Sequence, residues 1–328
     1  MTRRVGVWGL CLALGGALGV SGCSALHANR IPKVPLASLP LTTIKVEMPN
    51  GGTLAPGKKG QLVVTLTDSA GKVYSTNGKG EGKANWAELH LEATVVKVNA
   101  KGSVQMPKLP WESDGKVGHV TVTVPGLPEL KGEADVTPRY DVEYHANFSG
   151  TSGTNGMDGT NGLSGSDGSM GSIDPQHPSA GGNGSDGSNG TDGSNGGDGW
   201  SGPEVLVQVA LWPGNHALLE VEVSAGKSHV ESYLIDPVGG SVTVRSLGGS
   251  GGKGGSGGHG GRGGSGGVGS PNGMSGHDGL NGSDGRNGSD GNAGQVTLVY
   301  DPKAAPYIAA IHVPRNAVIH EQPVNPLW

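Results

Sequence analysis

The chain has 328 residues, of which 64 are glycine, and its formal net charge is −5. A chain so rich in glycine, with the single phenylalanine Phe148, is not expected to bury one large apolar core. The mild negative charge excludes the strongly basic surface that is typical of nucleic-acid binding.

The N-terminus has the pattern of an export signal followed by a lipidation site. Arg3 and Arg4 precede an apolar segment, 5–20, that has the length of a secretory signal and is short for a membrane span. The residues Val20-Ser21-Gly22-Cys23 then resemble the lipobox of bacterial lipoproteins. The resemblance implies that residues 1–22 are removed and that several acyl chains on Cys23 anchor the protein to a membrane.

The cysteine count limits the chemistry of the mature chain. Cys11 leaves with the signal, so lipidation of Cys23 leaves no thiol for a disulfide, a metal or a nucleophile. Ser24 stands where lipoproteins of the inner membrane carry aspartate, and the resemblance therefore implies that the protein lies in the cell envelope, at the outer membrane.

Residues 39–148 are predicted to form an antiparallel β-sandwich of immunoglobulin-like size, joined to the lipid by a proline-containing tether over 23–38. Alternating apolar and polar residues with many β-branched side chains predict half-buried strands. The strands are expected at 42–48, 61–66, 87–96, 119–124 and 140–144. Trp86 and Trp111 leave open a carbohydrate-binding module, although the core is the commoner place for tryptophan.

Residues 149–328 contain four segments in which every third residue is glycine. Each segment has eight glycines in register over 22 residues, and we call them tracts one to four: 150–171, 181–202, 248–269 and 273–294. A strict three-residue period predicts a helix with three residues per turn and glycine on its crowded face. Two architectures have this property, a trimeric collagen-like stalk and a bundle of polyglycine-II helices within one chain.

The positions of proline favour the bundle. Collagen relies on proline to fix the backbone dihedral angle φ, and none of the four tracts contains proline. Equal tracts with short connectors, 172–180 and 270–272, predict two hairpins in a monomer. Tract three is almost wholly Gly-Gly-x, and we expect it at the centre of the bundle because two of its faces carry no side chain.

One repeat matches a known architecture. Gly251-Gly252-Lys253-Gly254-Gly255-Ser256-Gly257-Gly258-His259-Gly260-Gly261-Arg262-Gly263-Gly264 resembles the glycine repeats of the snow flea antifreeze protein. The repeats of that protein form antiparallel polyproline-II-type helices, and a similar architecture occurs in the tip adhesins of some tailed phages. The resemblance implies the same kind of helices here. Strand signals in an insert, 203–247, and at 295–328 predict β elements at one end of a rod about 68 Å long, with both connectors at its far tip.

No enzyme active site, cofactor or metal site is predicted. Gly226-Lys227-Ser228 is not a phosphate loop, because Val221 occupies the position of its first glycine. Rows of aspartate and asparagine precede the glycines of tracts two and four, and we expect them to be solvated faces. Calcium binding by these rows is left open, although the nine-residue calcium-binding repeat is missing.

These features together favour a non-enzymatic adhesin or structural surface protein. Its expected partners are the membrane, through Cys23, and a surface protein or glycan. The predicted contact residues lie in the two connectors: Ile173, His177, Pro271 and Asn272. An ice-binding protein is the alternative, since regularly spaced hydroxyls such as those of Thr151, Thr154 and Thr160 can order water.

Overall fold

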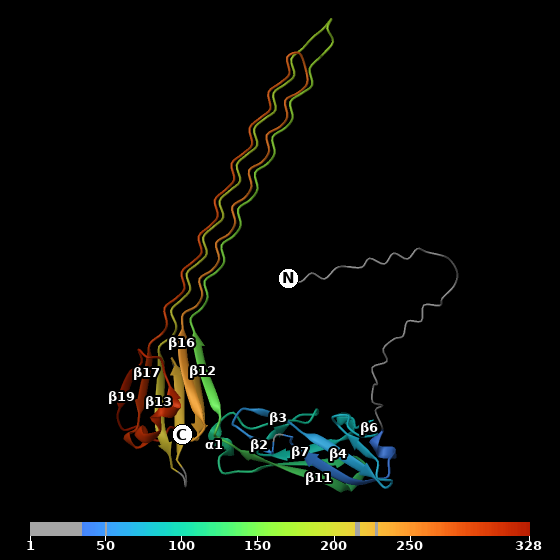
Figure 1. Cartoon of the computed structure of the whole chain (residues 1–328), viewed down its shortest axis with the longest axis vertical. Helices are drawn as coiled ribbons and strands as arrows, with labels where there is room; N and C mark the ends of the chain where they lie inside the picture. The colour runs from blue at the N-terminus through green and yellow to red at the C-terminus, as the bar shows by residue number, and fades with distance from the viewer. Residues whose placement is uncertain (1–34, 50, 214–216, 227–228) are drawn as a thin grey trace, which may run out of the picture.

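The protein is mainly β, with several sheets, and a long glycine-rich rod projects from two of them (Figure 1). The computed structural model describes residues 35–328 except 50, 214–216 and 227–228. The expected signal, Cys23 and most of the expected tether lie outside the described residues.

We divide the described chain into three parts. The N-terminal domain comprises residues 35–138, and the rod comprises the four tracts with their two connectors. The base comprises 143–149, 203–247 and 295–328, and the N-terminal domain lies beside it (Figure 1).

Two sheets of the N-terminal domain pack their apolar faces together. Their strand orders are β1-β4-β5-β6 and β2-β11-β10-β7, and a small third sheet has the order β3-β9-β8. Val64 and Leu66 on one sheet share a buried core with Val120 and Val122 on the other, which explains the alternating pattern of these strands.

The elements of this domain have the following bounds. They are η1 (Leu36–Ser38), β1 (Leu41–Glu47), β2 (Thr53–Leu54), β3 (Lys59–Gln61), β4 (Val63–Asp68), β5 (Val73–Ser75), β6 (Gly82–Lys83), η2 (Trp86–Glu88), β7 (His90–Thr94), β8 (Lys97–Val98), β9 (Ser103–Gln105), α1 (Pro110–Ser113), β10 (Gly118–Val124) and β11 (Leu127–Pro138).

Several segments of this domain differ from the sequence prediction, and two of the differences have a clear physical reason. The start of the strand expected at 87–96 is instead η2, where the side chain of Asn85 accepts a hydrogen bond from the N–H of Ala87. Strand β11 was not predicted, because its centre is Gly132 and its exposed residues are mostly charged. Glycine is required there, since a Cβ would lie 2.7 Å from Cγ2 of Val46.

The base is built from two further sheets around a second core. Their orders are β12-β16-β18 and β15-β14-β13-β17-β19. The bounds are β12 (Glu143–Ser149), β13 (Val205–Trp212), β14 (Leu218–Ala225), β15 (His229–Ile235), β16 (Ser241–Leu247), β17 (Val296–Tyr300), η3 (Pro302–Ala310), β18 (Ile311–His312) and β19 (Val318–Glu321). Phe148, Val207 and Val244 lie in its core. Only the last two residues of the strand predicted at 140–144 lie in a strand, β12, and this strand pairs with β16 of the base.

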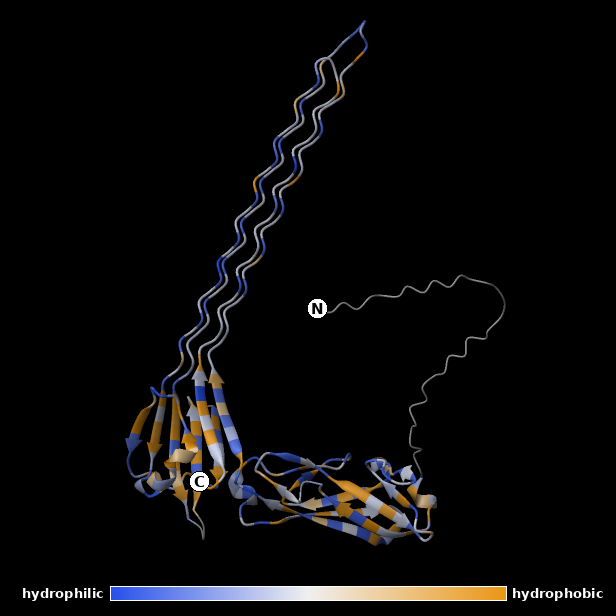
Figure 2. Cartoon of the chain, viewed as in Figure 1, coloured by the Kyte–Doolittle hydropathy of each residue, from blue (hydrophilic) through white to orange (hydrophobic). Residues whose placement is uncertain are grey.

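The four tracts run side by side from the base to a common tip (Figure 1). Tract one follows β12 and tract three follows β16, whereas tracts two and four lead into β13 and β17. Hydropathy separates the parts clearly: apolar residues concentrate in the sheets, and the rod is largely polar with isolated apolar positions (Figure 2).

The parallel strand pairs of the base continue into the rod with the same register. Ser149 of β12 is paired with Leu247 of β16, and the next residue, Gly150, donates its N–H to the Leu247 carbonyl at 2.9 Å. The same offset recurs along tracts one and three as far as Gly171, which donates to Val268 at 2.7 Å. The sheets therefore set the register of the rod from its first triplet.

Candidate functional site: the rod and its tip

Main-chain hydrogen bonds between tracts explain the glycine period. In tract one Gly156 donates its N–H to the carbonyl of Lys253 in tract three, at 2.7 Å. A Cβ at the neighbouring glycine Gly159 would overlap the carbonyl oxygen of Thr191 in tract two. Every third residue must therefore be glycine, because its α-carbon lies against the backbone of another tract.

Tract three contacts its neighbours through two rows of glycine. A Cβ at Gly254 would overlap the Gly285 carbonyl of tract four, and one at Gly255 would overlap the Met157 carbonyl of tract one. Its glycine row from 249 to 267 holds the only buried residues of the rod, all of which is described. The Gly-Gly-x pattern thus corresponds to a tract that has neighbours on two sides where no side chain fits.

The sequence predicted that the aspartate and asparagine rows are solvated faces. In the structure they also hold the tracts together. Each side chain reaches the next tract and accepts a hydrogen bond from a main-chain N–H that no carbonyl satisfies. Tract two serves tract four in this way, as in the 2.7 Å bond from the N–H of His277 to Asp186. Tract four serves tract three, as in the 2.8 Å bond from Gly257 to Asp284. These residues are exposed, yet one oxygen of each is part of the rod.

Hydroxyl groups have the same role between tracts one and two. The N–H groups of Met157, Thr160, Leu163 and Ser166 each donate at 2.7 Å to a hydroxyl of tract two: Ser194, Thr191, Ser188 and Ser185. The hydroxyls of Thr160 and Thr191 lie 3.1 Å apart. The hydroxyl row of tract two is thus occupied within the rod.

The two connectors meet at the distal end and stabilise each other. Asp174 organises the longer one: its side chain accepts the N–H of Gln176 at 2.9 Å and its carbonyl accepts the N–H of His177 at 3.0 Å. The N–H of Ser270 donates to the carbonyl of Ser179 at 2.8 Å, which joins the connectors directly. The tip is therefore a hydrogen-bonded structure of its own.

All four predicted contact residues lie at this tip, with different roles. Ile173 is exposed, and the imidazole of His177 lies 3.6 Å from the carboxylate of Asp174. Pro271 follows a cis peptide bond and its carbonyl accepts the N–H of Gly181. Asn272 builds the turn, because its side chain accepts the N–H of Gly269 at 2.9 Å.

Sequence reasoning missed three exposed apolar side chains beside the connectors. Met170 is 81% exposed, Val268 50% and Met274 73%, and Ile173, in the longer connector, is 69% exposed. We call these four residues the tip patch. A signal was present in the sequence, since each is an apolar residue among polar triplets, but the sequence does not show that they gather at one end.

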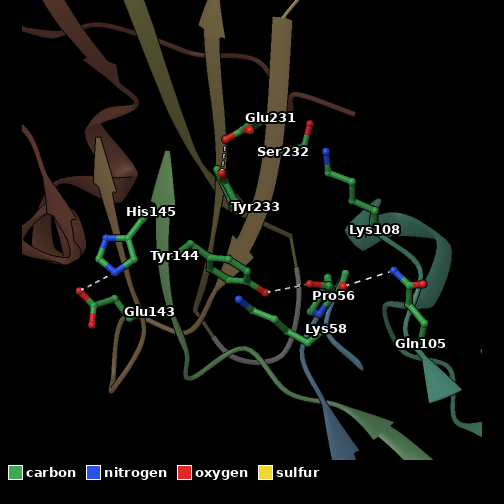
Figure 3. Close-up of a pocket in the computed structure, with 11 residues that line it drawn as sticks. Pro56, Lys58, Gln105, Lys108, Glu143, Tyr144, His145, Glu231, Ser232 and Tyr233 are labelled. Carbon is green, nitrogen blue, oxygen red and sulfur yellow. Dashed lines mark hydrogen bonds and ion pairs between the residues drawn. The ribbon is translucent and has the colours of Figure 1, made fainter. Parts of the chain in front are cut away.

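A pocket lies between the N-terminal domain and the base. This joint cavity has a volume of about 350 Å³, and Tyr144 and Tyr233 form its wall with ring centroids 4.8 Å apart (Figure 3). The ammonium of Lys58 lies 5.5 Å from the Tyr144 ring centroid, and the Tyr233 hydroxyl donates to Glu231. Burial raises the pKa of both tyrosines, so neither is a ready proton donor.

Neither tryptophan of the carbohydrate-binding alternative offers a free platform. Trp86 packs against the core of the N-terminal domain and covers Gly102, where a Cβ would overlap its ring. Trp111 is partly exposed, but its ring centroid lies 5.1 Å from that of Trp328.

Known proteins do not identify this chain. No protein-family model matches it, and no curated protein is significantly similar to it. Among the residues that the structure describes, no group of three or more His, Cys, Asp or Glu side chains is arranged to hold a metal ion. Within the same residues, every helix is too short or too polar to cross a membrane.

Proposed function

We propose that the protein is a lipid-anchored envelope protein, without enzymatic activity, that presents a binding surface at the end of a rigid rod. The observation that carries this proposal is the tip patch, which places four exposed apolar residues around two hydrogen-bonded connectors. Exposed apolar clusters on otherwise polar surfaces commonly mark interaction sites. The flexible side chains of methionine suit adaptable contacts with a protein or glycan surface.

The rod in this proposal is a monomeric bundle of four antiparallel polyglycine-II helices, and the N-terminal domain is an immunoglobulin-like sandwich. Support for the bundle comes from the glycine N–H groups, which find their acceptors within one chain. These glycine N–H groups are therefore not available for the hydrogen bonds between chains that a collagen-like trimer would need. Sedimentation velocity tests this part: an elongated monomer is expected, and a trimer would overturn it.

The anchor and its location form a separate part of the proposal. Acylation of Cys23 at the outer membrane follows from the lipobox alone. A Cys23→Ser variant should move from the membrane to the soluble fraction of the cell envelope, and mass spectrometry of the N-terminal peptide should find acyl chains in the parent only. An unmodified N-terminal peptide in the parent would contradict the anchor without affecting the rod.

The chain provides a matched control for the tip. Met157 and Leu163 are as exposed as the tip residues, at 80% and 79%, but they lie along the side of the rod. A Met170→Ser, Ile173→Ser variant should lose binding to cells and to panels of surface proteins and glycans, whereas Met157→Ser, Leu163→Ser should retain it. Equal losses in both variants would assign binding to the side of the rod.

Ice binding is the second candidate, because hydroxyl-bearing residues recur along tracts one and two. The engagement of the tract two hydroxyls in main-chain hydrogen bonds leaves fewer of them to order water. Thermal hysteresis and inhibition of ice recrystallisation are the direct measurements, and a protein with neither activity does not bind ice.

A further inference from the structure

Three tryptophans from distant parts of the chain meet where the N-terminal domain joins the base. Trp328 lies between Trp111, which belongs to α1, and Trp212, at the end of β13. The ring centroid of Trp328 is 5.1 Å from that of Trp111 and 6.3 Å from that of Trp212, and both pairs are tilted. One C-terminal side chain therefore contacts both parts of the molecule.

Two polar contacts hold the segment that carries Trp328. The N–H of Val324 donates to the carboxylate of Asp301 at 3.1 Å, and the N–H of Leu327 donates to Glu220 at 2.8 Å. Both carboxylates belong to the base. They hold the residues that precede Trp328, and Trp328 itself contacts the N-terminal domain.

Glu220 is an unusual residue for its position. It lies in the middle of β14, is fully buried, and has apolar neighbours along the strand. Burial of a carboxylate is costly unless hydrogen bonds compensate for lost hydration. Among the described residues its side chain accepts one hydrogen bond, from the N–H of Leu327, and its second carboxylate oxygen is buried without a partner, as is Nε1 of Trp328. The C-terminal segment therefore supplies the hydrogen-bond donor for this buried carboxylate.

Ala55 of the N-terminal domain packs into the core of the base, and hydrogen bonds also cross the joint. The Tyr140 hydroxyl donates to Asp114, directly after α1, at 2.6 Å, and the Tyr144 hydroxyl donates to the carbonyl of Pro56 at 3.4 Å. Small polar interfaces between domains permit relative motion. The tryptophan contact adds the large apolar area that these hydrogen bonds lack.

We propose that Trp111, Trp212 and Glu220 form a binding slot for an apolar peptide segment containing Leu-Trp, which residues 323–328 of this chain occupy. Occupation of the slot locks the N-terminal domain to the base and so fixes the direction in which the rod leaves the membrane-proximal part. The proposed slot does not depend on the proposed function of the tip patch, because its occupant is a segment of this chain and no ligand has to bind at the tip.

The test compares the full chain with single variants by measuring the distance between the two parts. Spin labels are placed on Cys residues at Lys131 and Lys303, both exposed, in a chain whose Cys11 and Cys23 are changed to Ser. The parent should give one narrow distance distribution. Trp328→Ala and Trp111→Ala should each broaden it, and Trp200→Ala, which removes an exposed rod tryptophan, should not. An unchanged distribution in both joint variants would overturn the proposal.

Glu220→Leu separates a lock from a merely structural residue. Replacing a buried carboxylate by an apolar side chain of similar size is often neutral or stabilising, so the melting temperature should stay equal or rise. The distance distribution should nevertheless broaden, because the acceptor for Leu327 is lost. A lower melting temperature with an unchanged distribution would assign Glu220 to the fold of the base and refute its role in the slot.

A binding measurement addresses the ligand class directly. A chain that ends at Gln322 should bind the synthetic peptide Pro-Val-Asn-Pro-Leu-Trp, detected by its tryptophan fluorescence. The Glu220→Leu change should weaken that binding by roughly tenfold, as expected for a hydrogen bond to a charged group. Equal affinity for a peptide ending in Leu-Ala would exclude an aromatic slot.

Discussion

The side chain of Asn161 accepts a hydrogen bond from the main-chain N–H of His259, 98 residues further along the chain, at 2.9 Å. The same separation relates Asn155 to Lys253 and Asp167 to Ser265. Tracts one and three are thus joined by a repeated contact between a side chain and a backbone, and this contact allows quantitative tests.

Asn161→Ala should weaken the rod locally. It removes the acceptor of the His259 N–H and leaves that group to water, at a cost in the free energy of unfolding of about 0.5–1 kcal/mol. Hydrogen exchange should therefore quicken at His259, whereas Asn161→Asp should preserve protection there. Identical exchange in the alanine variant and the parent would contradict the proposed contribution of the side chain.

Ser164→Asn should have the opposite effect. Ser164 occupies the next position in the same row, and no side chain in the described chain accepts the N–H of Arg262. An asparagine there should supply the missing acceptor, as Asn161 does, and slow the exchange of the Arg262 N–H. If exchange at Arg262 does not slow, the row depends on more than the length of the side chain.

Gly258→Ala should damage the rod far more than a change on its surface. A Cβ at Gly258 would overlap the Thr160 carbonyl oxygen, and backbone atoms cannot move aside as a flexible side chain can. We expect a loss of about 3 kcal/mol, at the upper end of typical overpacking effects. Ser256→Ala, on the exposed row of the same tract, is the control and should leave the thermal midpoint almost unchanged.

The stability of the base should decrease with rising pH because of Glu220. Burial raises the pKa of this carboxyl above its ordinary value of 4.5, and the bond from Leu327 opposes the shift only in part. Between 4.5 and the raised pKa the folded protein binds more protons than the unfolded chain, so the free energy of unfolding falls as pH rises.

The difference in stability between Glu220→Leu and the parent isolates this effect. It should grow as pH rises from 4.5 and become constant above the raised pKa. Denaturant titrations across this pH range provide the measurement. A difference that does not change with pH would show that Glu220 has an ordinary pKa in the folded protein.

The sequence alone predicts some features and not others, for physical reasons. A three-residue glycine period follows from the close approach of backbones, so the tracts and connectors are visible in it. The partners of Asp186 or Asn161 are not, because they depend on a register that the distant pairs β12–β16 and β13–β17 establish. Strand β12 was placed in the wrong part for the same reason.

The joint between the N-terminal domain and the base was invisible for a related reason. The joint cavity and the tryptophan contact assemble residues such as Lys58, Trp111, Tyr233 and Trp328, which no local pattern connects. Glu220 gave no signal in the sequence, since Glu222 follows it at the two-residue spacing of an ordinary solvent-exposed strand face.

The sheets of the base hold all four tracts in one shared register. The length of the rod is therefore fixed by the number of triplets in each tract. A triplet added to a single tract would leave its glycines without opposing backbone at one end and displace the connector. Lengthening the rod coherently requires one triplet in every tract, which extends it by about 9 Å. The reach of this protein can therefore change in evolution only in steps, each a coordinated change at four separate places in its gene.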